Sequence, residues 1–259
     1  MAEVAVQSIL VERQGAVCSI TLNKPPLNII DLAMIQEIHA ALQQAEKDAG
    51  IHVVVFKGGG EKGFSAGVSV QDHTPDRVGE MIPAFDDIFR LLAKTDKVTI
   101  AAVQGFCLGG GLELAIACDL VVASEKAQFG QPEIKLGQLA PIGLILLPHL
   151  IGYRKAAELL LTGASIGAAE AQSLGLVNRV VAPVQFSQAV DTLLKEITVQ
   201  SGAILKLTKS ALRRTSTLNF EQALKDTEDF FFATVMKTND AKEGIFAFLE
   251  KRAPQWTHA

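Results

Sequence analysis

The chain has 259 residues, 49% of them hydrophobic and 20% charged, and its formal net charge is −4 at pH 7. This length and apolar content suffice for one sizeable buried core. The acidic balance, without any Lys/Arg-rich run, argues against a nucleic-acid-binding surface. Three cysteines (Cys18, Cys107 and Cys118) lie in apolar contexts without metal-ligand spacing, so we expect buried free thiols and no metal site.

The N-terminal residues and the apolar runs show no pattern of export or membrane insertion. Residues 1–8 contain Glu3 and lack the apolar centre of a secretory signal. The longest apolar run, residues 144–150, contains Pro148 and His149 and is shorter than a membrane span. We therefore expect a cytoplasmic protein that does not contact membranes.

The first third of the chain predicts a hairpin, a helix and a buried strand. Residues 8–13 and 16–22 form two strands around Gln14-Gly15, a dipeptide that favours a tight turn. A proline-containing turn follows, and Asp31 is a suitable N-cap for a helix over residues 32–48. Residues 52–57 (HVVVFK) contain a continuous apolar run at 53–56, which is typical of a strand buried on both faces.

A glycine-rich loop follows over residues 58–67. It lacks the Gly-Lys-Ser/Thr end of a phosphate-binding P-loop, so we reject that function. Asp72 and His73 are sequence neighbours that rarely face each other, so a loop or helix cap is favoured over a catalytic dyad. The apolar spacing of residues 75–96 predicts an amphipathic helix.

The central stretch, residues 98–137, has the strongest pattern. A buried-type strand over residues 98–103 precedes three glycines, 109–111, which begin a short apolar helix that carries Glu113. Free N–H groups at such a helix start can bind an anion or an oxyanion. Glu133 follows a second strand and the stiffening Pro132, and two convergent carboxylates suit acid–base chemistry. Taken alone, each glutamate also has a structural interpretation: a helix-terminal carboxylate for Glu113 and a surface loop acid for Glu133.

The last third predicts mainly helices. Residues 153–161 and 165–174 have helical patterns, and residues 175–181 form a turn and a strand. From Pro183 the pattern is helical, with breaks at residues 201–202, 217–218 and 239–240.

These motifs resemble the crotonase (enoyl-CoA hydratase/isomerase) superfamily. The resemblance is densest in AAVQGFCLGGGLELAIACDLVVASEKAQFGQPEIKLG, residues 101–137, and it extends to ITLNKP at 20–25, GFSAGV at 63–68 and the segment 243–252, so it covers essentially the whole chain. It implies an α/β fold, a crotonase-type superhelix of ββα units. Residues 1–182 would form the acyl-CoA-binding and catalytic core, and residues 183–259 a helical region that assembles a homotrimer or a hexamer.

The resemblance also assigns roles to residues. The backbone N–H groups of Val68 and Gly110 would hold the thioester oxygen, Glu113 would activate water, and Glu133 would protonate carbon. Coenzyme A would be part of the substrate, with no separate cofactor. Residues implied in CoA or substrate binding are Pro26, Leu27, Ser65, Ala66, Gly67, Val70, Met81, Phe85, Gly109, Pro132, Ile142 and Lys251. For Lys251, complementation of a helix dipole is an equal alternative.

Two segments depart from the common family pattern. Ser69 stands where most members have Asp, and residues 138–146 are one residue shorter and more apolar than usual. Residues 64–82 and 140–150 resemble the cyclohexa-1,5-diene-1-carbonyl-CoA hydratases of anaerobic benzoyl-CoA degradation, which implies hydration of a cyclic dienoyl-CoA. Alternatives are a linear short-chain enoyl-CoA hydratase or isomerase, a crotonase-type thioesterase or ring hydrolase, and a non-catalytic binding protein.

Overall fold

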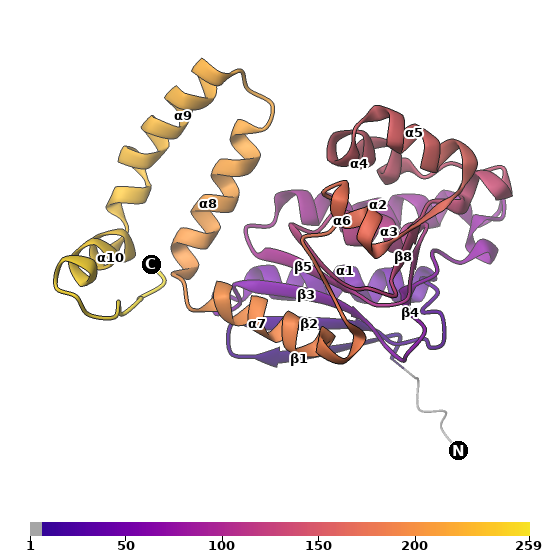
Figure 1. Ribbon diagram of the computed structural model, residues 1–259, viewed down its shortest axis with the longest axis horizontal. Helices are drawn as coiled ribbons and strands as arrows, with labels where there is room; N and C mark the ends of the chain where they lie inside the picture. Colours follow the sequence, from indigo (N-terminus) through magenta and orange to yellow (C-terminus); the bar gives the residue numbers. More distant parts are fainter. Residues whose placement is uncertain (1–6) are drawn as a thin grey trace.

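The computed structural model describes residues 7–259 and contains two sheets (Figure 1). The larger sheet has the strand order β1-β2-β3-β5-β7-β10, in which only the β1–β2 hairpin is antiparallel. Its strands are β1 (Ile9–Gln14), β2 (Val17–Leu22), β3 (Val53–Gly58), β5 (Val98–Val103), β7 (Leu120–Ser124) and β10 (Arg179–Val181).

The smaller sheet explains the repeating architecture. Its order is β4-β6-β8-β9, with β4 (Gly63–Ser65), β6 (Phe106–Leu108), β8 (Gln128–Gly130) and β9 (Ser165–Gly167). Three times, a strand of the large sheet is followed by a strand of the small sheet and then by a helix: α2 (Val78–Lys94), α3 (Gly110–Ile116) and α4 (Pro141–Ile151). This repeat confirms the expected superhelix of ββα units.

Both faces of the large sheet are buried at its central strands β3, β5 and β7. The main core lies between one face and helices that include α1 (Leu32–Lys47) and α2, and it includes Val54 and Phe56 of β3. On the opposite face, Val53 and Val55 pack with Val190 and Leu193 of α7 (Phe186–Thr198). Successive strand residues point to opposite faces, so burial of both faces requires the continuous apolar run that the sequence shows.

One predicted helix was wrong at its beginning. Residues 165–174 were expected to be helical, but residues 165–167 form β9, which pairs antiparallel with β8, and the helix α6 (Ala168–Ser173) starts afterwards. Pairing with β8 supplies backbone hydrogen bonds that a local pattern cannot reveal. The predicted helix at 153–161 is confirmed as α5 (Tyr153–Thr162). All three cysteines are free thiols as expected, but only Cys18 and Cys107 are buried, whereas Cys118 is half-buried.

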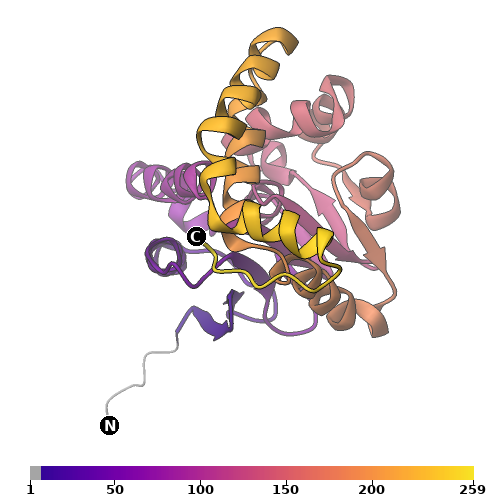
Figure 2. The ribbon, with the colours of Figure 1, turned by 90° about the vertical axis from the view of Figure 1, so that its left-hand side faces the viewer.

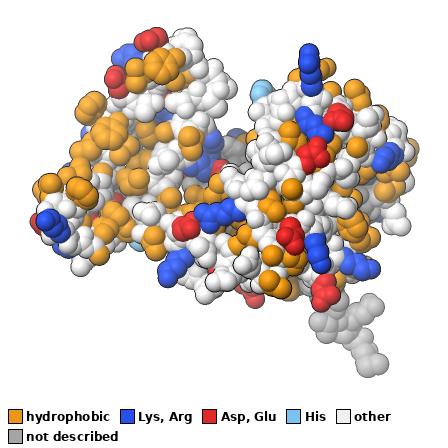
Figure 3. Space-filling view, in the orientation of Figure 1, with side chains coloured by type: hydrophobic (Ala, Val, Ile, Leu, Met, Phe, Trp, Pro, Cys, Tyr) orange, Lys and Arg blue, Asp and Glu red, His pale blue; other side chains and the backbone are white. Residues whose placement is uncertain are grey.

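The chain ends in a helical arm, composed of α8 (Gly202–Thr215), α9 (Phe220–Ala233) and α10 (Asn239–Leu249). The arm projects from the core in Figure 1, and Figure 2 views it from that side. Figure 3 shows many hydrophobic side chains on its surface. The exposed ones include Leu212, Phe220, Leu224, Phe231, Phe232, Phe246, Phe248 and Leu249. The expected domain boundary near residue 183 stays a prediction, and α7, just beyond it, packs on the core sheet.

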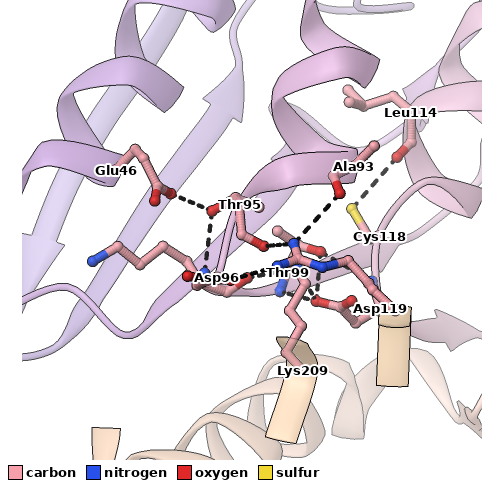
Figure 4. Close-up of polar contacts among 11 residues, drawn as sticks. Glu46, Ala93, Thr95, Asp96, Thr99, Leu114, Cys118, Asp119 and Lys209 are labelled. Atoms are coloured by element: carbon pink, nitrogen blue, oxygen red, sulfur yellow. Dashed lines mark hydrogen bonds and ion pairs between the residues drawn. The ribbon is translucent and has the colours of Figure 1, made fainter. Parts of the chain in front are cut away.

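Polar contacts fasten the base of the arm to the core (Figure 4). The Lys209 ammonium of α8 is buried, lies 2.7 Å from the Asp119 carboxylate and donates to the Lys97 carbonyl at 2.7 Å. Asp119 also accepts hydrogen bonds from the backbone and the hydroxyl of Thr99 in β5. The same carboxylate therefore joins β5 and α8.

No helix within residues 7–259 combines the length and the apolar character needed to cross a bilayer. The expectation that the chain lacks an export signal rests mainly on residues 1–6, which lie outside the described part.

Candidate active site

A cavity of about 550 Å³ lies between helix α2 and the two segments that carry Glu113 and Glu133. Its wall is mainly apolar, with Val78, Met81, Ile82 and Phe85 contributed by α2. Its ionisable side chains come from Glu113, Glu133, Asp86 and His73. The further lining residues are Ala66, Gly67, Val68, Val70, Thr74, Gly109, Gly110, Pro132, Leu136, Gln138, Leu139, Ala140, Pro141 and Ile142.

Glu113 is fixed by the start of helix α4. Its side chain is buried, and Oε1 accepts hydrogen bonds from the backbone N–H groups of Ile142 and Gly143, both at 2.9 Å. The pKa of Glu113 is raised to about 7, mainly by burial, with smaller raising contributions from the Glu133 and Asp86 charges and a lowering effect from the two N–H donors. Oε2 accepts no hydrogen bond from residues 7–259, so it remains available to a ligand.

Glu133 lies against the N-terminus of α3. It belongs to a short 3₁₀ turn, η2 (Pro132–Leu136), which follows β8. A Cβ atom at Gly109 would lie 2.7 Å from the Glu133 Oε1 atom, so the carboxylate can occupy this place only because residue 109 is glycine. Gly109 also has φ +54°, which glycine tolerates best. Burial raises the pKa of Glu133, and its buried Oε2 atom has no hydrogen-bond partner within the described residues.

The expected oxyanion donors lie on adjacent segments of the cavity wall. A Cβ atom at Gly110 would come within 2.4 Å of the Val68 Cγ2 atom, and one at Gly67 would lie 3.8 Å from the Gly110 nitrogen. Gly110 is the first residue of α3, where N–H groups have no partner within the helix. In residues 7–259 neither the Val68 nor the Gly110 N–H donates to a protein acceptor.

His73 was not expected in the site. It lines the cavity, and its charge lowers the pKa of Glu133. It does not form a dyad with Asp72: its Nδ1 atom lies 2.8 Å from the Ser69 carbonyl oxygen, while the buried Asp72 pairs with Arg77 at 2.9 Å. Asp72 also accepts from the Leu32 N–H, so it ties this loop to α1 although Ser69 replaces the usual Asp. The preference for a structural interpretation of Asp72-His73 is thus confirmed for Asp72.

Most of the residues expected from the sequence meet in this one cavity. The exceptions are Pro26, Leu27, Ser65 and Lys251, which do not line it. Ser65 is buried, donates to the Asn28 carbonyl at 2.8 Å and accepts from the Gly67 N–H, so it braces the loop instead of contacting a ligand. Leu27 accepts from the Ala66 N–H beside the cavity. Lys251 follows the last residue of α10, Leu249, at the end of the arm.

The apolar run after Gly137 contributes less to the cavity than expected. Its first part, including Ile142, lines the wall, but Leu144 and Ile145 of α4 are exposed. Conversely, Val78, Ile82 and Asp86 of α2 line the cavity and were not singled out. Val78, Ile82 and Asp86 are four residues apart, which places them on the same helix face as Met81 and Phe85. This spacing is the sequence signal that predicts their place in the wall.

The family model described as enoyl-CoA hydratase/isomerase matches residues 12–259. The chain belongs to the enoyl-CoA hydratase/isomerase family. A relative from Rhizobium meliloti, described as a probable enoyl-CoA hydratase, is 38% identical over 97% of this chain and 98% of its own length. A cyclohexa-1,5-dienecarbonyl-CoA hydratase from Thauera aromatica is 35% identical, over 96% of this chain and 95% of its own.

Solved structures agree with this membership. The enoyl-CoA hydratase from Bacillus anthracis has a TM-score of 0.92 and 30% identity, and the match covers 98% of this chain and 100% of that one. The names of these enoyl-CoA hydratase/isomerase members support hydratase chemistry, a lyase reaction, for this chain as well.

Proposed function

We propose that the protein adds water to the conjugated double bond of an enoyl-CoA thioester, with Glu113 and Glu133 as the catalytic pair. The observation that carries this proposal is the convergence of both glutamates on one cavity whose wall is otherwise largely apolar. A single carboxylate would suffice to move a double bond, whereas hydration requires one group to activate water and another to protonate carbon.

Glu113 is assigned as the base. Its pKa of about 7 matches a base that works near neutral pH, and Oε1 is held by two N–H donors while Oε2 is free to take a proton from water. Glu133 is assigned as the acid that protonates the carbon next to the thioester. Its raised pKa and its unpartnered buried Oε2 atom suit a carboxyl that carries and releases a proton. The two roles exchange when water is eliminated.

The thioester oxygen would lie between the Val68 and Gly110 N–H groups. Negative charge develops on this oxygen as water attacks, and donors already in place stabilise the transition state more than the ground state. Loss of one such donor typically costs about 3 kcal/mol. The adjacent N-terminus of α3 adds the positive end of its helix dipole.

The proposed substrate is cyclohexa-1,5-diene-1-carbonyl-CoA, which would place the enzyme in the degradation of aromatic compounds. The wall of α2 and the Ile142 region offers apolar surface for a ring, and the Thauera aromatica relative bears the name of this activity. A linear short-chain enoyl-CoA is the second candidate, because the Rhizobium meliloti relative is described only as an enoyl-CoA hydratase.

We also propose an oligomeric state, further contacts with coenzyme A and a cellular location for the enzyme. The exposed apolar side chains of the arm suit a homotrimer or a dimer of trimers. In such an assembly Lys251 could meet the phosphates of coenzyme A bound to a neighbouring subunit, and Pro26 and Leu27 would border the nucleotide. We propose a cytoplasmic enzyme that requires no cofactor beyond the coenzyme A of its substrate.

The test is hydration of cyclohexa-1,5-diene-1-carbonyl-CoA and of crotonyl-CoA, followed by loss of absorbance and by product mass. Wild type should add one water to the cyclic substrate, and Glu133→Gln should abolish turnover. Glu125→Gln is the matched control, because Glu125 is exposed and does not line the cavity. Brisk hydration of crotonyl-CoA alone would retain the two-glutamate mechanism and reject the cyclic substrate. Inactivity on both would refute the hydratase function.

A further inference from the structure

A second cavity adjoins the active site. It measures about 420 Å³ and shares two lining residues, Asp86 and Ile142, with the catalytic cavity. Asp86 and Arg90 are its only ionisable lining residues within the described chain. The others are Phe89, Leu92, Ala93, Ile116, Ala117, Ile145 and Leu146. Asp86 and Ile142 therefore lie on the wall that the two cavities share.

Asp86 has no hydrogen-bond partner among the described residues and only one long ion pair. It lies on α2 between Phe85 and Phe89, both of which are buried. No residue of the described chain donates a hydrogen bond to it, and its nearest cationic atom, Arg90 Nη2, is 3.9 Å away. Arg90 instead binds Asp87 at 2.7 Å. Burial raises the pKa of Asp86, which shows that the surroundings oppose its charge.

The consequence for an acyl chain follows from solvation. The Asp86 side chain is 27% exposed, so water still solvates the carboxylate. A hydrocarbon chain that continued from the catalytic cavity into the second one would displace this water and offer no hydrogen bond in return. Desolvation of a charge is strongly unfavourable when it gains no hydrogen bond, and the exposed Arg90 guanidinium at 3.9 Å is the only cation paired with Asp86 within the described residues. A ring or a short chain that ends before Asp86 avoids this cost.

We propose that Asp86 is a specificity-determining residue that keeps long apolar chains out of the second cavity and so restricts the enzyme to compact acyl groups. This inference rests on the proposed hydration of enoyl-CoA thioesters. It adds the far limit of the acyl site, set by charge at Asp86 rather than by the size of the cavity alone.

The test compares kcat/KM for trans-2-butenoyl-CoA and trans-2-decenoyl-CoA in wild type, Asp86→Asn and Asp86→Leu. Wild type should strongly favour the short substrate. Asn keeps the volume of Asp, and both Asn and Leu remove its charge. Both variants should therefore raise the ratio of kcat/KM for decenoyl-CoA to kcat/KM for butenoyl-CoA by about tenfold or more, with Leu above Asn. The ratio within one variant cancels any effect of the Asp86 charge on Glu113. Glu80→Gln, an exposed carboxylate on the same helix, should leave the ratio unchanged.

A binding measurement gives a readout that does not need turnover. The affinity for saturated decanoyl-CoA, relative to butyryl-CoA, should increase in both Asp86 variants by a similar factor. A wild-type enzyme that hydrates both chain lengths equally well would overturn the inference, and so would variants that keep the wild-type ratios. Both results would leave the hydratase function intact. An enzyme inactive on every enoyl-CoA would instead refute the proposed function, and the inference with it.

Discussion

Replacement of Glu113 by glutamine should stabilise the folded protein at neutral and alkaline pH while it abolishes hydration. The carboxylate is buried, and its pKa rises from an ordinary value of 4.5 to about 7 on folding. A group whose pKa is higher in the folded state favours folding at low pH, and this contribution is lost as the pH rises through the folded pKa. The contribution of Glu113 to wild-type stability is therefore lost between about pH 4.5 and pH 7, and Glu113→Gln lacks this pH-dependent contribution.

The magnitude follows from the pKa difference. Two and a half pH units at about 1.4 kcal/mol each correspond to about 3 to 4 kcal/mol, most of which falls between pH 4.5 and pH 8. The glutamine oxygen can still accept the Ile142 and Gly143 N–H groups, so the hydrogen bonds that Glu113 provides to α4 are retained. The gain in stability should consequently come from removal of the charge.

The assay is denaturant-induced unfolding at fixed protein concentration, from pH 4.5 to pH 8.5. The difference in unfolding free energy between Glu113→Gln and wild type should be smallest at the acidic end and grow by about 3 kcal/mol towards pH 8. The exposed Glu125→Gln control should show no such trend. A difference that stays constant with pH would contradict the assignment of Glu113 as a buried, charge-strained carboxyl.

Three further perturbations test other parts of the structure. Gly109→Ala should lower kcat by about 100-fold, because the new Cβ atom would displace the Glu133 carboxylate. In the control Gly79→Ala a Cβ atom meets nothing within 4 Å, so kcat should not fall. Equal kcat values for the two variants would contradict the role of Gly109 in placing Glu133. His73→Gln removes a charge that lowers the pKa of Glu133. The limb of the kcat/KM pH profile that reports Glu133 should therefore move to higher pH. An unchanged profile would contradict an electrostatic effect of His73 on Glu133. Lys209→Met should cost about 2 kcal/mol of unfolding free energy, since it leaves Asp119 without its cation. The exposed control Lys206→Met should change the unfolding free energy by less than about 0.5 kcal/mol. Similar losses for both variants in urea denaturation would contradict the role of Lys209 in joining the arm to the core.

Motif-bearing residues of the site were predictable because they depend on local chemistry. The glycines at 109–111, the apolar helix around Glu113 and the proline before Glu133 each constrain the backbone within a few residues. Twelve of the expected residues, the glutamates among them, indeed line one cavity.

Other site residues depend on contacts that are distant in the sequence. Ser65 belongs to the GFSAGV motif at residues 63–68, but its hydroxyl donates a hydrogen bond to the Asn28 carbonyl. Ser65 therefore supports the cavity wall without lining the cavity. Asp86 and His73 carry no motif, and their place in the wall results from how α2 and the preceding loop pack over α3. The strands of the small sheet are three residues long, too short for any periodic signal.

The sequence by itself determined the family resemblance, the long strands, most helices and the choice of Glu113 and Glu133 as the proposed catalytic pair, since apolar periodicity, glycine conformation and motif order are properties of neighbouring residues. The tertiary structure alone decided that the Glu113 carboxylate binds the first turn of α4, that its pKa is near 7, and that Asp86 stands between two cavities. Burial, desolvation and the convergence of separate segments are properties of the packed molecule, and no local stretch of chain encodes them.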